Sequence, residues 1–203
     1  MALSRMRPER TLRIIAGQWR GRKFRFPPSA IRPTPDRVRE TLFNWLSPRI
    51  AGAHCLDLFA GSGALGLEAL SRGAAQVTFV EQQRAAAVAI EQLLEQWHAV
   101  GGHVHCEDAL HHLATPPGRA YDVVFLDPPF AAGLLSSCAA WLERGWLTPD
   151  ARIYVEHARR DPSPEVPAGW QQLRTGTAGE VGYHLYGLHG AGDALPAGRG
   201  GKT

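Results

Sequence analysis

The chain has 203 residues, of which 44% are hydrophobic and 20% charged, and these values suit one domain with a sizeable buried core. Three cysteines without paired spacing, and no apolar segment of signal-peptide or membrane-spanning length at the start, argue against a disulfide-stapled secreted fold and predict a cytoplasmic protein. Residues 1–50 hold 12 Lys/Arg against 3 Asp/Glu, whereas residues 51–203 hold 10 against 16. This split predicts a basic region that meets a polyanion, although a solvated basic tail is the alternative.

The first predicted element is a small β-hairpin. The segment LRIIAGQWRGRKFRF, residues 12–26, has two extended runs around two glycines, which is typical of a hairpin. Its three aromatic residues either pack beneath it or stack on a base. Packing is favoured because small hairpins need an apolar face to stay attached. The hairpin carries five cations: Arg13, Arg20, Arg22, Lys23 and Arg25.

A helix is predicted next, within RPTPDRVRETLFNWL at residues 32–46. Thr34 can cap it and Pro35 fits the first helical position. The residues Val38, Leu42, Trp45 and Leu46 fall on one face of this helix, so that Arg37 and Arg39 point elsewhere.

After residue 50, short apolar runs alternate with segments of helical periodicity. The predicted strands are His54–Ala60, Gln76–Glu81, His103–Asp108, Tyr121–Asp127 and Ala151–His157, and the predicted helices lie in 65–72, 84–97 and 134–146. Repeated strand-helix-strand units indicate a doubly wound α/β fold with a parallel sheet. Residues 170–188 follow as a hairpin turning within 176–182, and the Gly/Ala/Pro-rich tail, 189–203, is predicted to be flexible.

A glycine-rich loop follows the first of these strands, in LDLFAGSGALG. Gly61, Gly63 and Gly66 have the G-x-G-x-x-G spacing that lets the backbone turn into a helix and pass close to a ligand. Alone, this pattern also fits a simple tight turn. Glu81 strengthens it, because an acid that ends the second strand about 20 residues later can accept hydrogen bonds from ribose hydroxyls.

The same features would suit a dinucleotide dehydrogenase. Asp57 distinguishes such an enzyme from a protein that binds a nucleoside with a positive group. A carboxylate only four residues before Gly61 would repel a pyrophosphate and attract a cationic ligand. Asp108, at the end of the third strand, is either an acceptor for an adenine amino group or a helix cap.

DLFAGSG, Glu81, Asp108-Ala109 and Asp127-Pro128-Pro129-Phe130 occur in an order that resembles S-adenosylmethionine-dependent methyltransferases acting on exocyclic amino groups of bases. The resemblance covers residues 51–188. It implies a seven-stranded, mostly parallel (Rossmann-like) sheet, with Gly182–Leu188 as an antiparallel last strand. It also implies a set of cofactor-binding residues: Asp57, Phe59, Gly61, Ser62, Gly63, Glu81, Gln82, Asp108 and Ala109.

The FLDPPF stretch fits the chemistry of such a transfer. An exocyclic amine is a poor nucleophile because its lone pair is delocalised into the ring. Asp127 and the carbonyl of Pro128 can each accept one N–H and aim that lone pair at the methyl group. Pro129 stiffens the turn, and Phe130 offers a face on which an extruded base can stack. No metal is needed for this step.

A narrower resemblance involves RIIAGQWRGRKFRFP, RPTPDRVRETLFNWL and LDLFAGSGALGLEALSRGA. Together with FLDPPF, these segments resemble the bacterial 16S ribosomal RNA (guanine-N2) methyltransferase family, although Ala16 and Pro35 replace a glycine and a threonine typical of it. The resemblance implies that residues 1–50 contact 16S rRNA or the assembling small subunit, and that the enzyme is a monomer. Besides the hairpin cations, it implies an RNA-facing set beside the base pocket: Arg32, Arg37 and Arg39.

Two other functions remain open at this point. A DNA adenine-N6 or cytosine-N4 methyltransferase would share every active-site feature, and a non-catalytic RNA-binding module would keep the fold. Glu156 and His157 end the fifth strand and could border a substrate cleft, although a buried or solvent-facing strand terminus is the favoured interpretation. A further group of histidines and one cysteine matches no zinc spacing and is interpreted as structural: His103, His105, Cys106, His111 and His112.

Overall fold

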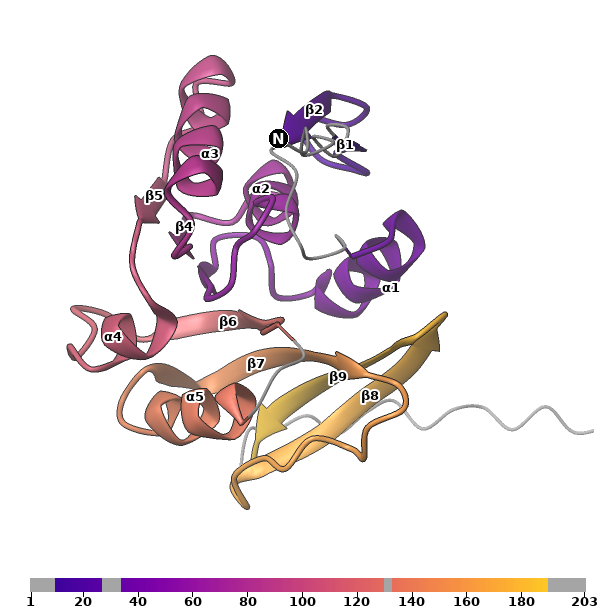
Figure 1. The fold of residues 1–203 in the computed structure, drawn as a ribbon, viewed down its shortest axis with the longest axis vertical. Coiled ribbons are helices and arrows are strands. Elements are labelled where there is room, and N and C mark those ends of the chain that lie inside the picture. Colours follow the sequence, from indigo (N-terminus) through magenta and orange to yellow (C-terminus); the bar gives the residue numbers. More distant parts are fainter. Residues whose placement is uncertain (1–9, 27–33, 130–132, 190–203) are drawn as a thin grey trace, which may run out of the picture.

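The computed structural model describes residues 10–26, 34–129 and 133–189 (Figure 1). Its main sheet has seven strands in the order β5-β4-β3-β6-β7-β9-β8. Their bounds are β3 His54–Asp57, β4 Gln76–Val80, β5 Gly102–His105, β6 Tyr121–Leu126, β7 Leu147–Ala158, β8 Trp170–Ala178 and β9 Val181–Leu188.

The direction of the strands confirms the predicted doubly wound fold. β3 pairs in parallel with both β4 and β6, so the strand order reverses beside it, and β5 and β7 extend the parallel part on either side. β9 is antiparallel to both β7 and β8, and it contains the predicted antiparallel strand 182–188. Ligands of open parallel sheets bind at the carboxyl ends of the strands near such a reversal.

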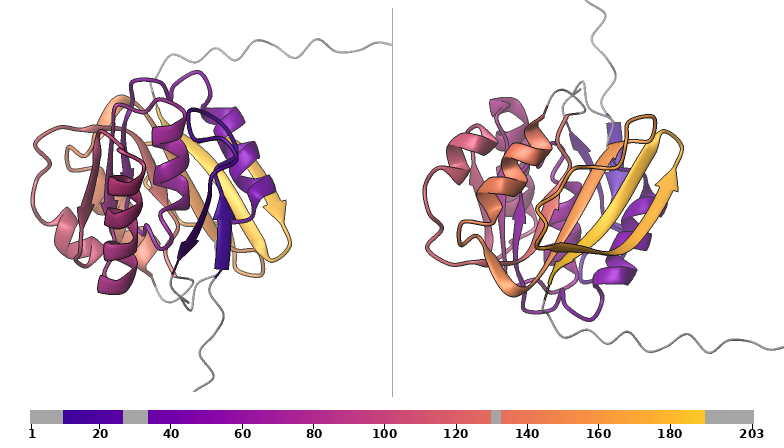
Figure 2. Two further views of the ribbon diagram at one scale, coloured as in Figure 1. Left: turned by 90° about the horizontal axis from the view of Figure 1, so that it is seen from above. Right: turned by 90° about the horizontal axis from the view of Figure 1, so that it is seen from below.

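Helices cover both faces of the sheet (Figure 2). α1 (Asp36–Leu46), α2 (Ala64–Ser71) and α3 (Arg84–Gln96) contribute to one hydrophobic core, and α4 (Ala109–Leu113) and α5 (Leu134–Leu142) contribute to the other. The sequence did not predict α4, which is only five residues long. α5 ends four residues before the predicted limit. No helix in the described ranges is both long and apolar enough to cross a bilayer.

The N-terminal hairpin forms as predicted, from β1 (Arg10–Arg13) and β2 (Lys23–Phe26). Trp19, Phe24 and Phe26 are each 5% exposed or less, so the aromatic residues pack and do not present a face to solvent. Trp19 and Phe24 contact the ring of Trp97 after α3, with centroids 5.2 and 5.8 Å away. The hairpin therefore shares the core of the parallel sheet. The predicted division into domains at residue 50 stays a prediction.

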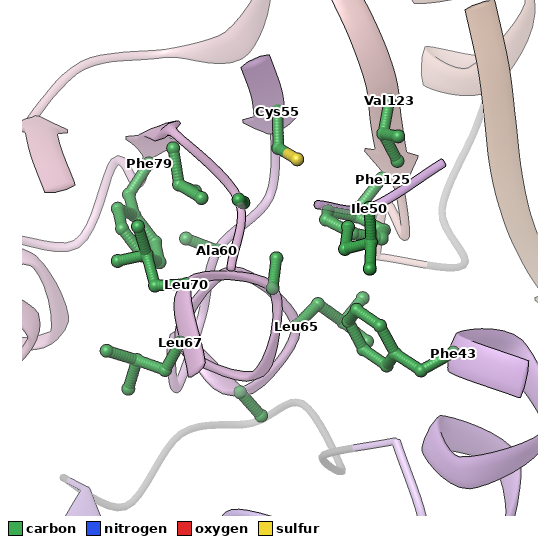
Figure 3. Close-up of a cluster of buried hydrophobic side chains, with 14 of the residues drawn as sticks. Phe43, Ile50, Cys55, Ala60, Leu65, Leu67, Leu70, Phe79, Val123 and Phe125 are labelled. Carbon is green, nitrogen blue, oxygen red and sulfur yellow. The ribbon is translucent and has the colours of Figure 1, made fainter. Parts of the chain in front are cut away.

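α2 is the helix that the hairpin covers. All eight residues of α2 are buried, which is the pattern of a helix enclosed on every side. Figure 3 looks along this helix, with Leu65 directed toward Phe43 and with Phe79 on its other side. A Cβ atom on Gly17 would lie 1.8 Å from the carbonyl oxygen of Ser71, so this close approach requires glycine in the hairpin.

Glu68 of α2 joins the hairpin to the body of the protein. Its two carboxylate oxygens accept hydrogen bonds from the backbone N–H groups of Ile15 and Ala16, at 2.8 and 3.0 Å. Two arginines pair with the same carboxylate, Arg72 at 2.7 Å and Arg39 at 3.6 Å. Glu68 and Arg39 are both fully buried. One charged group thus fixes two backbone amides and two cations inside the core.

Three expectations for the segment around α1 are wrong. Asp36, and not Pro35, is the first helical residue. Thr34 does not cap the helix, because its hydroxyl donates to Glu156 at 2.8 Å, and the cap position falls on Pro35. Arg39 does not point toward RNA. Its guanidinium lies between Asp36, 2.6 Å away, and Glu68. The apolar spacing of α1 did not reveal a buried cation, because Glu68, the buried acid that pairs with it, lies on another helix.

We expect Glu68→Ala to lower the free energy of unfolding by about 3 kcal/mol or more, because it leaves the Arg39 charge and two backbone amides without their buried partner. Urea unfolding followed by circular dichroism measures this value. Glu91→Ala, an exposed position on α3, is the matched control and should change it by less than about 0.5 kcal/mol. An equally small effect of both substitutions would contradict the structural role of Glu68.

Candidate active site

The predicted site residues gather where β3, β4, β5 and β6 end. In the loop after β3, Gly61 and Gly63 have φ values of +52° and +75°, a region that favours glycine. Gly66 has a different reason, since a Cβ there would lie 2.1 Å from the ring of Phe79. Gly61 therefore allows the turn, Gly63 begins α2, and Gly66 allows α2 to pack closely on β4. Phe59 and Ser62 of the same loop are half-buried.

Asp57 lies at the end of β3 and is 2% exposed. Its carboxylate accepts a hydrogen bond of 3.0 Å from the N–H of Gly66 in the first turn of α2. Burial raises the pKa of Asp57 to about 7, with a further contribution from the charge of Glu81, while the bond from Gly66 acts in the opposite direction. A bound cation near this group would favour its ionised form. Attraction of such a cation by Asp57 stays a prediction.

Glu81 is held rigidly between two loops. One of its oxygens accepts from the N–H of Gly61 at 2.8 Å and the other from the N–H of Gln83 at 2.7 Å. The residue is 7% exposed, so it is not a solvated strand end. Each carboxylate oxygen has a second lone pair, which leaves room for the predicted bonds from ribose hydroxyls. Gln82 is exposed beside it.

Asp108 performs the capping role that the sequence left open. Its Oδ1 accepts from the N–H groups of Leu110 and His111, at 2.8 and 3.1 Å, and so begins α4. Asp108 is exposed and Ala109 is buried. The second oxygen of Asp108 has no part in these two bonds, so a contact with adenine is compatible with the cap and stays a prediction.

Asp127 follows β6, and the structure places Glu156 beside it. Leu126 of β6 pairs with Val155 of the parallel strand β7, so the next residues, Asp127 and Glu156, lie on the same face at the carboxyl ends of adjacent strands. Burial of its carboxyl group raises the pKa of Asp127 well above the usual value, and the charges of Glu156 and then Asp57 add to the rise. Three acids thus act on one another at this edge.

A cavity of about 290 Å³ reaches one of these acids, Glu156. Pro128, Pro129, Glu156 and His157 line it, together with residues of α5 and of the segment after β7. Phe130 lies outside the described residues. Glu156 is buried near the end of β7, as one interpretation of the sequence had it, and it also lines this cavity, which agrees with the alternative that it borders a cleft. Its signal in the sequence was an acid inside the apolar run RIYVEHA. A larger open hollow of about 1050 Å³ lies along β5 and α3 and contains none of the predicted site residues.

The predicted RNA-binding cations fall into three groups. Arg13, Arg20, Arg22, Lys23, Arg25 and Arg37 are exposed, Arg39 is buried, and Arg32 lies outside the described residues. The turn that holds Arg20 contacts Ser71 at the end of α2, through the bond from Gln18 N–H to the Ser71 carbonyl. The glycine loop lies at the other end of this helix, about 12 Å away. RNA that reaches both must therefore extend along the hairpin.

The histidines after β5 lie closer together than the sequence indicated. The Nδ1 atom of His112 lies 2.8 Å from a carboxylate oxygen of Glu107, and His105 Nδ1 lies 3.5 Å from the same oxygen. One atom from each of these three residues lies within 4.8 Å of the others, a grouping that the spacing alone missed because Glu107 was not considered. His112 also contacts the ring of Trp146. That the protein needs no metal stays a prediction.

We expect the free energy of unfolding to respond to pH through Asp57. With a folded pKa of about 7 and an ordinary value near 4 in the unfolded chain, the folded state binds one proton more between these limits. Its stability therefore falls as pH rises from about 4 to 7, by up to about 1.4 kcal/mol per pH unit. Asp57→Asn removes this contribution, so the difference between the wild type and the variant should change with pH.

Urea unfolding at pH 5, 6 and 7 measures that difference. The lowered pKa values of His105 and His184 and the raised pKa of Glu156 act in both proteins and cancel in the comparison. The charge of Asp57 contributes to the raised pKa of Asp127, so the measured difference includes this coupling. Asp150→Asn, at an exposed position of β7, is the control and should follow the wild type. If the free energy of unfolding changed with pH in the same way for Asp57→Asn and the wild type, the raised pKa of Asp57 would be contradicted.

Comparison with known proteins identifies relatives along most of the chain. A family model described as "Conserved hypothetical protein 95" matches residues 12–187. "Ribosomal RNA small subunit methyltransferase D" of Escherichia coli K12 is 51% identical over 177 residues, which are 86% of this chain and 89% of that protein. The protein of the same name from Haemophilus influenzae is 46% identical and is covered to 93%.

Solved structures agree with the fold. The structure of yhhF from Escherichia coli has a TM-score of 0.81 and 48% identity, covering 88% of this chain and 98% of that one. A Thermus thermophilus 16S rRNA N2 G1207 methyltransferase, solved with AdoMet and guanosine, has a TM-score of 0.63 at 22% identity, covering 89% of this chain and half of that one. This second likeness concerns the fold alone. The chain therefore belongs to the family described as conserved hypothetical protein 95, the same family as relatives named ribosomal RNA small subunit methyltransferase D.

Proposed function

We propose that this protein transfers a methyl group from S-adenosylmethionine to the exocyclic N2 amino group of a guanine in 16S ribosomal RNA. The single observation that carries the proposal is the juxtaposition of Asp127-Pro128 with Asp57 and the glycine loop at one edge of the sheet. The relatives named for small-subunit ribosomal RNA support the choice of substrate. The proposal places the enzyme in the bacterial cytoplasm.

The residues present fit the cofactor. Asp57 and Asp127 are acids with raised pKa values, and a positively charged ligand would lower the cost of ionising them. Glu81 is fixed by two backbone amides beside the glycine loop, in a position to accept bonds from a ribose. Bound S-adenosylmethionine would supply a methyl group on a cationic sulfur, which leaves as a neutral thioether.

Asp127 and Pro128 prepare the amine. The carboxylate and the carbonyl each accept one N–H, which draws the nitrogen toward a pyramidal shape with its lone pair directed at the methyl carbon. The nitrogen forms the new N–C bond as the C–S bond breaks, and the electron pair of that bond stays with sulfur. The positive charge then rests on nitrogen, and its proton passes to Asp127 or to water.

The test is methyl transfer from radiolabelled cofactor with the purified full-length protein. Small-subunit particles from cells that lack the activity should accept label on guanine N2, and DNA should not. DNA as the better acceptor would replace the proposal with a DNA amino methyltransferase. RNA binding without turnover on any nucleic acid would leave only a binding module.

Asp127→Ala should lower kcat by about 10²-fold or more, because it removes an acceptor that acts on the reacting nitrogen. Binding of S-adenosylmethionine, measured by calorimetry, should persist, which separates loss of chemistry from loss of fold. Asp150→Ala at an exposed site is the matched control, with kcat close to that of the wild type. Activity of Asp127→Ala near the wild-type value would remove Asp127 from the mechanism.

The hairpin cations should control RNA affinity and not cofactor affinity. Replacing Arg20, Arg22 and Lys23 with alanine should weaken RNA binding and reduce the slope of log K against log salt by about 2 to 3, because each phosphate contact contributes about 0.7 to 0.9. Filter binding over a range of salt concentrations measures this slope. The control Arg119→Ala, on a loop away from the hairpin, should shift it by less than one, and an unchanged slope in the triple variant would refute RNA contact by the hairpin.

A further inference from the structure

Glu156 is a buried acid whose role the proposed reaction leaves unexplained. It is 3% exposed, next to Asp127 by strand register, and it lines the cavity that begins at Pro128 and Pro129. An acid in this position, facing a cavity and another acid, is costly unless donors satisfy it. Two donors come from the protein itself, and both approach one side of the carboxylate.

Those donors are hydroxyl groups. Thr34 Oγ1 and Tyr154 Oη each donate to Oε1 of Glu156 at 2.8 Å. Within the described part of the chain, the hydrogen bonds to this carboxylate fall on Oε1, so Oε2 keeps its capacity to accept. The two hydroxyls also fix the orientation of the carboxylate, because Tyr154 is fully buried and Thr34 is 5% exposed. The arrangement is a rigid, preorganised acceptor at the edge of a cavity.

The neighbouring atom of the target amine distinguishes the bases. On the Watson–Crick edge, the exocyclic amine of adenine or cytosine is adjacent to a ring nitrogen that accepts hydrogen bonds, whereas N2 of guanine is adjacent to N1–H, which donates. Asp127 and Pro128 account for the two hydrogens of the amine. A third acceptor next to Asp127 would accept the N1–H of guanine. In adenine or cytosine the same acceptor would face the lone pair of the ring nitrogen, which is unfavourable.

On the basis of the proposed function, we propose that Glu156 is a specificity-determining residue whose Oε2 accepts the N1–H of the target guanine. Thr34 and Tyr154 are positioning residues that hold the carboxylate. This contact deepens the substrate assignment, because it selects guanine over both bases of a DNA amino methyltransferase by an unfavourable acceptor–acceptor contact as well as by a favourable bond.

The experiment uses small-subunit particles reconstituted with RNA in which the guanine that the enzyme methylates is replaced by 2,6-diaminopurine. This base keeps the 2-amino group and has an acceptor at N1. A third RNA carries 2-aminopurine, which also keeps the amine and the N1 acceptor but has no group at position 6, so it reports any effect of that position. We expect wild-type kcat/KM to be about 10- to 100-fold higher for guanine than for either analogue.

Glu156→Leu removes the acceptor at similar volume and should bring this ratio close to one. Thr34→Val keeps the carboxylate but removes one of the two hydroxyls that position it, so it should lower the ratio only in part. Glu95→Gln, exposed on α3, should leave the ratio unchanged. If Glu156→Leu kept the wild-type preference for guanine over both analogues, the inference would be overturned. If that variant fails to fold, the wild type decides: equal methylation of guanine and diaminopurine overturns the inference, and strong preference for guanine over both analogues supports it. Failure of the wild type to methylate guanine would instead remove the proposed function.

Discussion

A parallel sheet brings the ends of its strands to one edge, and here this constraint places three acids within one another's electrostatic influence. Asp57 ends β3, Asp127 directly follows β6 and Glu156 lies near the end of β7, and these three strands are neighbours in the sheet. The pKa of each is raised, and burial is the largest cause. Burial therefore disfavours the ionised form of each, and each charge adds to the cost of ionising its neighbours. Ligands that carry positive charge or N–H donors would recover part of that cost, which is why the site suits a sulfonium donor and an amine acceptor.

Asp57, Glu156 and a further buried acid, Glu68, contact segments that lie far apart in the chain. Asp57 holds the N-terminal turn of α2 through Gly66, and Glu156 holds Thr34, which follows the hairpin in sequence. Glu68, further along α2, holds the hairpin backbone and two arginines. The N-terminal segment is therefore anchored by two buried carboxylates, Glu68 of α2 and Glu156 of β7. The short helix α2 thus contacts both the hairpin, through Glu68, and Asp57 at the end of β3, through Gly66.

The sequence predicted the parts of this structure that depend on local pattern. Apolar runs located every parallel strand, and the glycine spacing located a loop in which two of the three glycines need positive φ. Glu81 drew attention through its distance from the glycine loop, and the structure places it against that loop, although its contact with a ribose stays a prediction. Asp127 was found because the residues around it form a motif, although the structure does not describe Phe130.

What the sequence missed depends on partners distant in the chain. Arg39 has the spacing of a surface residue, and only the fold shows that Glu68 faces it. Thr34 has the position of a helix cap, but Glu156 lies 122 residues away and is the acceptor it uses. The importance of Glu156 follows from its strand register beside Asp127. None of these pairings produces a periodic signal, so composition and spacing alone could not predict them.

The most direct test of the central claim is mass spectrometry of nucleosides from 16S ribosomal RNA of a strain that lacks this gene. The account predicts that N2-methylguanosine at one position disappears, that expression of the wild-type protein restores it, and that Asp127→Ala, although present at a comparable level, does not. A full complement of N2-methylguanosine in the deletion strain, or restoration by Asp127→Ala, would contradict it.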